Sequence, residues 1–383
     1  MSLTSRAGIY LHVPFCVRKC PYCSFFSAKA KPGEITAYLK AVMTHLELLT
    51  RDPLLHDLRF QTIFFGGGTP SLLSAETLGQ LLAACRRFFP FSTKIPEVSI
   101  EVNPGTLDAA DLHLLRKAGF NRLSIGVQSF CDVELQKIGR IHSAQEANNI
   151  FLEARKAGFD NISIDLMYGL PGQKIESWTT TLKKTLALQP DHLSLYELTP
   201  EEPSEFDTRL KQGEVTLPSE ETVLAMMEAI DELVIPQGLP RYEISSYAAP
   251  DSQCHHNLNY WHNGFYVGLG PGAVSAYGGC RRANPSNLAL YSSRVMRQEQ
   301  IWCDEEQLTR EEAFRETVVM GLRMIAGISA ASLLVRFGFY LGEYYADVLP
   351  ELLAAQLISW NGESLSLTPK GFSLANQVMA KLV

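Results

Sequence analysis

The stretch His12-Val13-Pro14-Phe15-Cys16-Val17-Arg18-Lys19-Cys20-Pro21-Tyr22-Cys23-Ser24-Phe25 decides the fold, because it places three cysteines directly after an apolar run near the start of the chain. Cysteine thiolates are the usual ligands of a [4Fe-4S] cluster, which has four irons. Three thiolates leave one iron without a protein ligand, and that iron can bind a substrate or a cofactor. Phe25 stands two residues after Cys23, where a fourth cysteine would be expected.

The composition is that of a large folded protein without nucleic-acid or membrane features. Of 383 residues, 46% are hydrophobic and 20% are charged, which predicts one large domain and a smaller one. The formal net charge of -7 disfavours a nucleic-acid surface, which is normally basic. Residues 1–14 contain no signal peptide and no apolar run approaches roughly 18 residues, so we expect a cytoplasmic protein without a membrane span.

The eight cysteines have two interpretations. A large chain without a secretion signal is expected in a reducing compartment, so disulfides are disfavoured and the tight cluster is predicted to bind metal or to act in redox chemistry. Four scattered cysteines are interpreted as small buried hydrophobic residues: Cys85, Cys131, Cys280 and Cys303. Cys254 lies beside two histidines and is considered with them below.

Residues 8–200 repeat one plan, a short apolar run followed by a longer amphipathic stretch. The apolar runs predict strands at residues 8–14, 62–68, 97–104, 122–129, 161–171 and 192–200. The amphipathic stretches predict helices at residues 34–49, 74–88, 108–118, 143–157 and 176–188. Such alternation requires a parallel sheet with its reactive groups at the carboxyl ends of the strands. The predicted fold class is therefore α/β, a partial (β/α)6 TIM-type barrel.

The remainder of the chain does not repeat this strand–helix plan. A helix is predicted at residues 219–234, and an aromatic-rich stretch follows at residues 242–277. Helices at 310–325, 329–337 and 340–355 precede short strands at 357–360 and 364–367 and a last helix from Pro369. We therefore predict a barrel at residues 1–240, an aromatic-rich segment at 241–303 and a small winged-helix-like α/β accessory domain at 304–383. Packing or partner contact is the expected role of this last domain.

Polar residues mark the ends of the predicted strands. Glu101, Gln128 and Asp165 lie at or near the ends of three successive strands, and those ends converge on one mouth. Each residue alone could be a strand-end cap. Arg140 suits a carboxylate but could equally be a surface charge. The glycine triplet at residues 66–68 indicates only a tight turn by itself, and without a following lysine it disfavours phosphate binding.

The spacing of Cys16, Cys20 and Cys23 has a zinc site as its alternative, with His12 or a distant histidine as fourth ligand. Structural zinc usually uses paired C-x2-C units or a C-x2-C unit with H-x3-H, and one such unit is present here. The C-x3-C-x2-C pattern after a first barrel strand instead resembles the radical S-adenosylmethionine (radical SAM) superfamily. That resemblance implies a [4Fe-4S] cluster whose open iron chelates S-adenosylmethionine, with the glycine triplet near the methionine amino group.

The resemblance narrows to the family of oxygen-independent coproporphyrinogen III dehydrogenase and its relative, the heme chaperone HemW, and it covers essentially the whole chain. The matching segments are residues 10–23, 65–70, 101–105, 125–129, 139–142 and 165–172. By this likeness, eight residues would line the S-adenosylmethionine site: Tyr10, Gly66, Gly68, Thr69, Glu101, Gln128, Arg140 and Asp165.

Two features favour the chaperone over the dehydrogenase. The dehydrogenase pattern carries a further cysteine at the place of Phe25 and a longer segment before the cluster, whereas this chain reaches Cys16 early. An H-N-x-x-Y-W run at residues 256–261 also resembles the segment associated with heme binding in HemW proteins. Family members often have a histidine where this chain has Val274, which puts any role of that histidine in doubt.

The heme motif has a physical rationale and a plain alternative. Imidazole is a common axial ligand of heme iron, and Tyr260 and Trp261 offer flat apolar surface to a porphyrin. The alternative is that His256 hydrogen-bonds locally while the two aromatic residues fill the core. The resemblance favours heme contact by His256, Tyr260 and Trp261. Three neighbours are further ligand candidates: Cys254, His255 and His262.

The sequence thus predicts a chain that accepts heme and passes it to respiratory or other hemoproteins, carrying a [4Fe-4S] cluster and S-adenosylmethionine. The second hypothesis is an enzyme that oxidises the propionate side chains of coproporphyrinogen III with a 5'-deoxyadenosyl radical. A third, an iron or zinc module without S-adenosylmethionine, explains neither Glu101 nor Asp165. The sequence leaves open a homodimer, the cleavage of S-adenosylmethionine, the recipient hemoprotein and the mode of heme attachment.

Overall fold

A curved parallel sheet forms the centre of the molecule. The computed structural model describes residues 6–200 and 204–383. Six parallel strands lie side by side in chain order: β1 (Arg6–Val13), β2 (Arg59–Gly67), β3 (Glu97–Val102), β4 (Arg122–Gln128), β5 (Ile162–Tyr168) and β6 (His192–Glu197). Their positions agree with the six predicted strands. The fully buried Ile9, Ile63 and Leu123 lie on one face of the sheet, where they join the main hydrophobic core, and this burial explains why the strands are rich in apolar residues.

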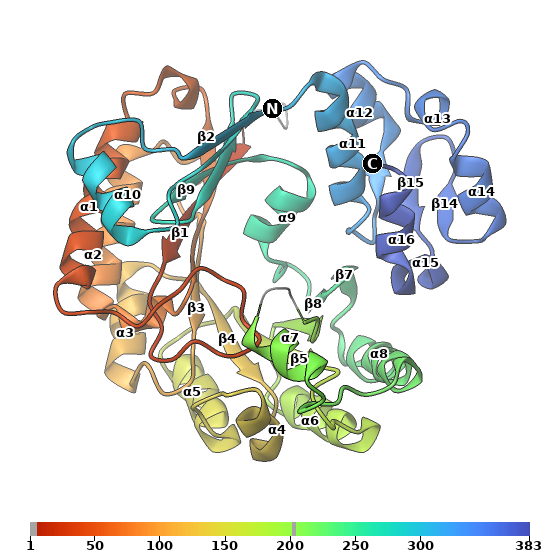
Figure 1. Cartoon of the computed structure of the whole chain (residues 1–383), viewed down its shortest axis with the longest axis horizontal. Coiled ribbons are helices and arrows are strands. Elements are labelled where there is room, and N and C mark those ends of the chain that lie inside the picture. The colour runs from red at the N-terminus through yellow and green to blue at the C-terminus, as the bar shows by residue number, and fades with distance from the viewer. Residues whose placement is uncertain (1–5, 201–203) are drawn as a thin grey trace.

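Helices cover the outer face of this sheet, as Figure 1 shows along its left and lower rim. They are α1 (Glu34–Leu49), α2 (Ala75–Phe88), α3 (Ala109–Ala118), α5 (Ala144–Lys156) and α6 (Ile175–Ala187), with a short α4 (Asp132–Lys137) that the sequence analysis did not predict. Ser143 and Glu146 form the predicted capping box at the start of α5. Short 3₁₀ helices occur at η2 (Pro53–Leu55), η3 (Pro70–Leu72) and η4 (Ile235–Gln237).

The sheet is wider than the six predicted strands, with 12 strands in all in the described chain. Beside β1 lie β9 (Phe265–Leu269), β10 (Val274–Tyr277), β11 (Cys280–Ala283) and β12 (Asp304–Gln307); beside β6 lie β8 (Ser246–Ala248) and β7 (Arg241–Glu243). Strand β9 is parallel to β1, and the other five are antiparallel to their neighbours. The aromatic-rich segment therefore extends both edges of the sheet. Strands of three to five residues are too short to show a recognisable alternation of apolar and polar residues in the sequence.

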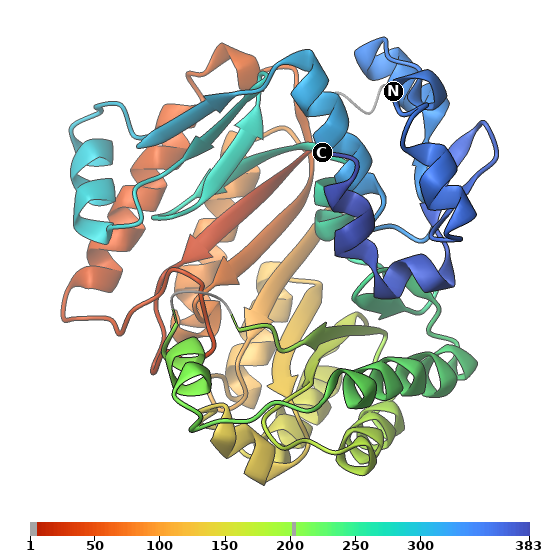
Figure 2. The same ribbon diagram turned by 45° about the vertical axis from the view of Figure 1, so that its right-hand side comes forward.

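Four further helices accompany these edge strands: α7 (Glu205–Lys211), α8 (Glu220–Val234), α9 (His255–Trp261) and α10 (Leu288–Met296). Figures 1 and 2 both show α9 on the inner side of the sheet, between the strands and the C-terminal unit. Among the described residues, no helix combines the length and the apolar character needed to cross a membrane.

The C-terminal unit has a hydrophobic core of its own, which begins at Phe314. Its elements are α11 (Arg310–Gly321), β13 (Ile328–Ser329), α12 (Ala330–Phe337), α13 (Leu341–Tyr344), α14 (Leu349–Ala354), β14 (Ile358–Trp360), β15 (Ser364–Leu367), α15 (Pro369–Ser373) and α16 (Ala375–Ala380). The predicted continuous helix at 340–355 is wrong, because α14 restarts with Pro350 in its first turn and proline is not accommodated in a helix interior. The domain boundaries at 240/241 and 303/304 remain predictions.

Contacts with α9 and β7 hold the C-terminal unit against the barrel. The guanidinium of Arg336 donates to the carbonyls of His262 and Asn263, which follow α9. The backbone N–H of Ile244 donates to the carbonyl of Arg323, and the guanidinium of Arg323 lies 4.2 Å from the ring centre of Trp261. The C-terminal unit therefore packs directly on the end of the predicted heme motif (Figure 2).

Gly270 provides a test of close packing within the barrel. It lies in the turn between β9 and β10, where the chain passes close to His12 of β1. Its φ of 95° and the 2.4 Å distance from a built Cβ to the His12 carbonyl oxygen both exclude a side chain. We expect Gly270→Ala to lower the free energy of unfolding by about 3 to 5 kcal/mol. Gly158 has a φ of 87° and no heavy atom within 4 Å of a built Cβ, so Gly158→Ala should cost only about 1 kcal/mol. Urea unfolding measures both, and equal losses would contradict the clash.

Candidate functional site

The three cysteines lie in the loop that follows β1, at the carboxyl end of the parallel strands. Two backbone hydrogen bonds close this loop, from Cys16 N–H to the Ala28 carbonyl (3.0 Å) and from Ala28 N–H to the Pro14 carbonyl (2.9 Å). Within the loop, Cys23 N–H donates to the Cys20 carbonyl (3.0 Å). All three thiols are free and half-buried. The loop therefore presents three thiols at the mouth of the barrel, where a cluster could bind them.

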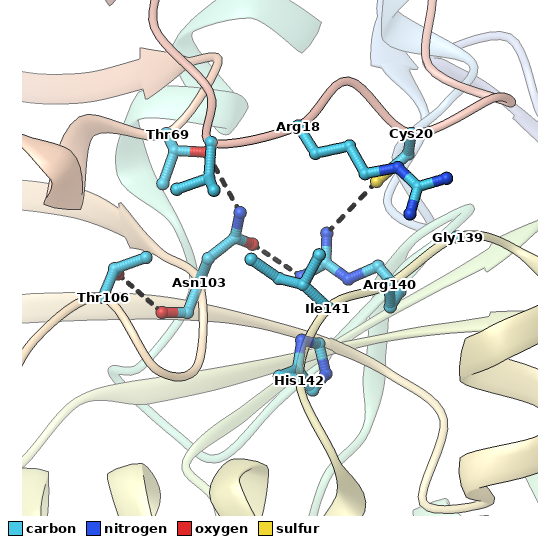
Figure 3. Close-up of a pocket in the computed structure, with 10 residues that line it drawn as sticks. Arg18, Cys20, Thr69, Asn103, Thr106, Gly139, Arg140, Ile141 and His142 are labelled. Carbon is cyan, nitrogen blue, oxygen red and sulfur yellow. Dashed lines mark hydrogen bonds between the residues drawn. The ribbon is translucent and has the colours of Figure 1, made fainter. Parts of the chain in front are cut away.

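Two polar side chains point at these sulfurs. The Thr69 hydroxyl donates to Cys16 Sγ at 3.5 Å. Figure 3 shows the second contact, in which Arg140 Nη1 lies 3.9 Å from Cys20 Sγ. Burial raises the pKa of the Cys23 thiol and so favours its neutral form, whereas coordination to a metal deprotonates a thiol. Donors and a positive charge stabilise the thiolate form, which is the metal ligand. These residues thus fit a thiolate-bound cluster.

His12 holds the cysteine loop in place and is not free to bind metal. Its Nε2 is 2.8 Å from the Phe26 carbonyl and its Nδ1 is 3.2 Å from the Tyr10 hydroxyl, so both ring nitrogens are engaged. Burial lowers the pKa of His12, which keeps the ring neutral. Within residues 6–200 and 204–383, no three His, Cys, Asp or Glu side chains converge as ligands of a single metal ion.

Asn103 links Thr69 to Arg140 beside the cysteine loop, as Figure 3 shows. The Asn103 amide donates to Thr69 Oγ1 (3.0 Å) and accepts from Arg140 Nη2 (2.6 Å), and the same Nη2 lies 2.6 Å from the Gly126 carbonyl. Arg140 is therefore fixed at the mouth and is not a free surface charge. Sequence reasoning missed Asn103, although its position directly after β3 was an available signal.

The glycine triplet lets β2 approach the cysteine loop. Gly68 N–H donates to the Val13 carbonyl at 2.8 Å, and a Cβ on Gly68 would lie 2.6 Å from the Phe15 carbonyl oxygen. A Cβ on Gly66 would lie 3.0 Å from the Tyr10 ring. A side chain at either position would push these segments apart. The glycine triplet therefore allows the end of β2 to lie close to β1 and the cysteine loop, in addition to forming a turn.

A cavity of about 270 Å³ lies inside the barrel, between the mouth and α9. Of the predicted S-adenosylmethionine residues, Tyr10, Glu101 and Asp165 line it, while Thr69 and Arg140 line the small pocket at the mouth beside Cys20. Gly66 lies beside the cavity residue Tyr10, since a Cβ on Gly66 would be 3.0 Å from its ring. Gln128 ends β4 with a φ of 68° and is not among the residues that line either pocket in the described chain.

Burial changes the acid–base behaviour of the cavity. It raises the pKa of Glu101 to about 8, with a further contribution from Asp165 and an opposing one from the Gly67 N–H, which donates to Glu101 Oε2 at 3.1 Å. Burial also raises the pKa of Asp165, but hydroxyl donors oppose it, including Ser124 at 2.8 Å and Ser163 at 2.9 Å. Near neutral pH, Glu101 is therefore a neutral carboxylic acid that can donate a hydrogen bond.

His256 lies at the base of the cavity, on the first turn of α9, and is 0% exposed. Its Nδ1 is 2.8 Å from Thr62 Oγ1 and its Nε2 is 3.0 Å from the Tyr260 hydroxyl. Burial lowers its pKa to about 3, so the imidazole is neutral. The ring stacks on Phe64 with centres 5.1 Å apart. The local hydrogen bonding of the alternative interpretation is therefore present, and heme contact by His256 stays a prediction.

The neighbours of His256 have different environments. Glu97, at the start of β3, accepts hydrogen bonds from the backbone N–H groups of His255 (2.8 Å) and His256 (3.0 Å), and so fixes the first turn of α9. Cys254 is buried, and burial raises its pKa to about 12, so it is a neutral thiol. His255 and His262 are exposed at the two ends of α9. Trp261 packs under Arg323, and its Nε1 is buried without a hydrogen-bond partner in the described chain.

Comparisons with known proteins identify two family models and a set of relatives. The model for the radical SAM superfamily matches residues 10–185, and the model for the HemN C-terminal domain matches residues 308–374. A protein named heme chaperone HemW from Bacillus subtilis is 36% identical over 372 residues, covering 96% of this chain and 97% of that one. The protein of the same name from Escherichia coli is 40% identical over 274 residues, covering 70% and 69%.

A solved structure is similar over nearly the whole chain. Coproporphyrinogen III oxidase (HemN) from Escherichia coli, described as a radical SAM enzyme, superimposes with a TM-score of 0.85 at 26% identity. The match covers 99% of this chain and 90% of that one. Together with the family models, it confirms the predicted fold class, a radical SAM α/β fold with a small C-terminal domain.

The raised pKa of Glu101 predicts a pH dependence of stability. Because the folded state holds a proton that the unfolded chain releases above its ordinary pKa of 4.5, this contribution is lost as pH rises through about 8. We expect Glu101→Gln to flatten the fall in the free energy of unfolding between pH 6 and 8, by at most about 1.4 kcal/mol per pH unit, as measured by urea unfolding at each pH. The exposed Glu228→Gln serves as control. Parallel curves for the wild type and Glu101→Gln would refute the assignment.

Proposed function

We propose that this chain, which belongs to the radical SAM superfamily and within it to the HemW family, binds heme and passes it to recipient hemoproteins. The observation that carries the proposal is the joining of two features by one barrel: the cysteine loop lies at the carboxyl end of the strands, and the cavity below it reaches His256 and Tyr260. The sequence similarity to the HemW protein of Bacillus subtilis, with 36% identical residues over 96% of this chain, supports the same assignment.

The mouth residues support a [4Fe-4S] cluster on Cys16, Cys20 and Cys23. When bound, such a cluster supplies an iron without a protein ligand, on which the amino and carboxylate groups of S-adenosylmethionine can bind. Arg140 is positioned for a carboxylate, because it is fixed by Asn103 beside Cys20. Glu101 and Asp165 provide hydrogen-bonding groups on the cavity wall.

Two observations favour heme transfer over catalysis on a porphyrinogen. Phe25 stands in place of the further cysteine of the dehydrogenase pattern, and its side chain is 65% exposed beside the cysteine loop. His256 carries a neutral imidazole, which is the form that ligates iron. Its Nε2 is occupied by the Tyr260 hydroxyl, so heme ligation requires this hydrogen bond to open.

Oxidation of coproporphyrinogen III is the second candidate. The observation in its favour is the structural similarity to the Escherichia coli coproporphyrinogen III oxidase across 99% of this chain. Turnover of coproporphyrinogen III by the reconstituted protein under anaerobic conditions would promote this function over heme transfer.

The cluster assignment predicts that Cys20→Ser removes the metal. The anaerobically reconstituted wild type should contain about four irons and about four sulfides per chain, and Cys20→Ser should lose most of both. Cys303 is exposed and remote in the sequence from the loop, so Cys303→Ser should keep the wild-type content. Iron and sulfide analysis measures the result. Zinc in place of iron and sulfide would overturn both candidate functions.

The heme assignment predicts opposite effects of two substitutions in α9. His256→Ala removes the ligand and should weaken heme binding roughly tenfold or more. Tyr260→Phe keeps the aromatic surface and releases Nε2, so it should preserve or strengthen binding. Heme titrations followed by the shift of the Soret band measure both effects.

The exposed histidines provide the controls for these titrations. His255→Ala and His262→Ala should bind heme as the wild type does, because they leave the buried pair of His256 and Tyr260 unchanged. An unchanged Soret shift in His256→Ala would show that this histidine is not the ligand. Loss of the shift in His255→Ala or His262→Ala alone would assign ligation to that exposed ring.

A further inference from the structure

Arg122 is a buried arginine whose guanidinium has no hydrogen-bonding partner in the described chain. It begins β4, is 2% exposed and lines the cavity that contains His256 and Tyr260. Its Nε is fully buried, and no carboxylate of residues 6–200 and 204–383 lies within 4.0 Å of the guanidinium. A buried charged group is normally paired. An arginine that faces a cavity without a partner is therefore available to a ligand.

The neighbouring groups of the described chain make no hydrogen bond with the guanidinium of Arg122. Ser99 faces Arg122 across the β3–β4 pair, and its hydroxyl is also buried without a partner. The Glu97 carboxylate is used by the backbone N–H groups of His255 and His256. Asp165 accepts from serine hydroxyls. Arg122 and Ser99 therefore lie side by side on neighbouring strands, and of the two it is Arg122 that lines the cavity.

The charge of Arg122 is permanent under all working conditions. Burial opposes the charged form, but nearby acidic groups, including the carboxyl groups of Glu97 and Asp165, hold the pKa of Arg122 above its usual range. Glu101, which shares the cavity, has its pKa raised to about 8 and carries little negative charge near neutral pH. The cavity therefore offers a fixed cation to a ligand with only Asp165 as a competing anion on its wall.

The surroundings of Arg122 define the class of ligand. The rings of Tyr10, Phe64 and Tyr260 provide aromatic wall in the same cavity. Arginine recognises a carboxylate through two parallel N–H donors. With about 270 Å³, the cavity lies just below the roughly 300 to 1,000 Å³ of typical ligand pockets, so a tetrapyrrole ring would lie only partly inside it.

We propose that Arg122 is the binding residue for a propionate of the tetrapyrrole, which enters the cavity by its carboxylate edge beside His256 and Tyr260. This inference rests on the proposed heme-binding function and specifies how the ligand is oriented. Arg122 at the base of the cavity thereby complements Arg140 at the mouth, where the cysteine loop lies. The two arginines belong to different pockets and serve different carboxylates.

The test compares heme with heme dimethyl ester, in which both carboxylates are masked. The reconstituted wild type should bind heme roughly 10- to 100-fold more tightly than the diester, as expected for a charge-assisted hydrogen bond. Arg122→Gln should bind the two ligands with equal affinity, and Arg122→Lys should keep part of the preference. The exposed Arg297→Gln should behave as the wild type. The preference is a ratio measured within one protein, so partial loss of folded material does not alter it.

Each alternative outcome has its own meaning. Equal affinity of the wild type for both ligands, or an unchanged preference in Arg122→Gln, would overturn the inference while leaving heme binding intact. Absence of binding of either ligand to the wild type would overturn the proposed function, and the inference with it. If Arg122→Gln instead weakens S-adenosylmethionine binding and keeps the heme preference, the carboxylate belongs to that cofactor and the inference is wrong.

Discussion

The close contact between the glycine turn after β2 and the cysteine loop after β1 is the constraint on which the site depends. Gly68 and Thr69 donate backbone hydrogen bonds to the Val13 and Phe15 carbonyls, and no side chain fits between these segments. This contact places the Thr69 hydroxyl against Cys16. Asn103 then connects Thr69 to Arg140, so strands β2, β3 and β4 all contribute to the setting of the sulfurs.

Helix α9 is the second organising element, because it connects the base of the barrel with the C-terminal unit. Glu97 fixes its first turn and the hydrogen bond between His256 and Thr62 holds it inside the sheet. At its other end, Trp261 packs under Arg323 of the C-terminal unit. Displacement of the C-terminal unit would therefore reach the cavity through one short helix of seven residues.

The sequence predicted the parallel half of the fold well, because long periodic segments and chemically marked ends carry strong signals. It predicted neither the edge strands nor the break in the helix at 340–355, where short elements and Pro350 outweigh local periodicity. In the site, five of the predicted residues line one cavity, but Asn103 and Arg122 were missed. Arg122 stands at the start of an apolar strand, and only the fold shows that its side chain faces a cavity.

Two buried or half-buried arginines of the barrel, Arg122 and Arg140, have different hydrogen-bonding environments. An unpaired buried guanidinium destabilises a fold, since transfer of its charge from water is costly unless a partner compensates. Arg122 at the base has acidic groups nearby but no hydrogen-bonding partner in the described chain, whereas Arg140 at the mouth is bound by Asn103 and Gly126. A guanidinium that already has hydrogen-bond partners is held in position for a ligand. A buried guanidinium without such partners gains more free energy when a ligand supplies the hydrogen bonds. The base of the barrel is therefore where a carboxylate would stabilise this chain most.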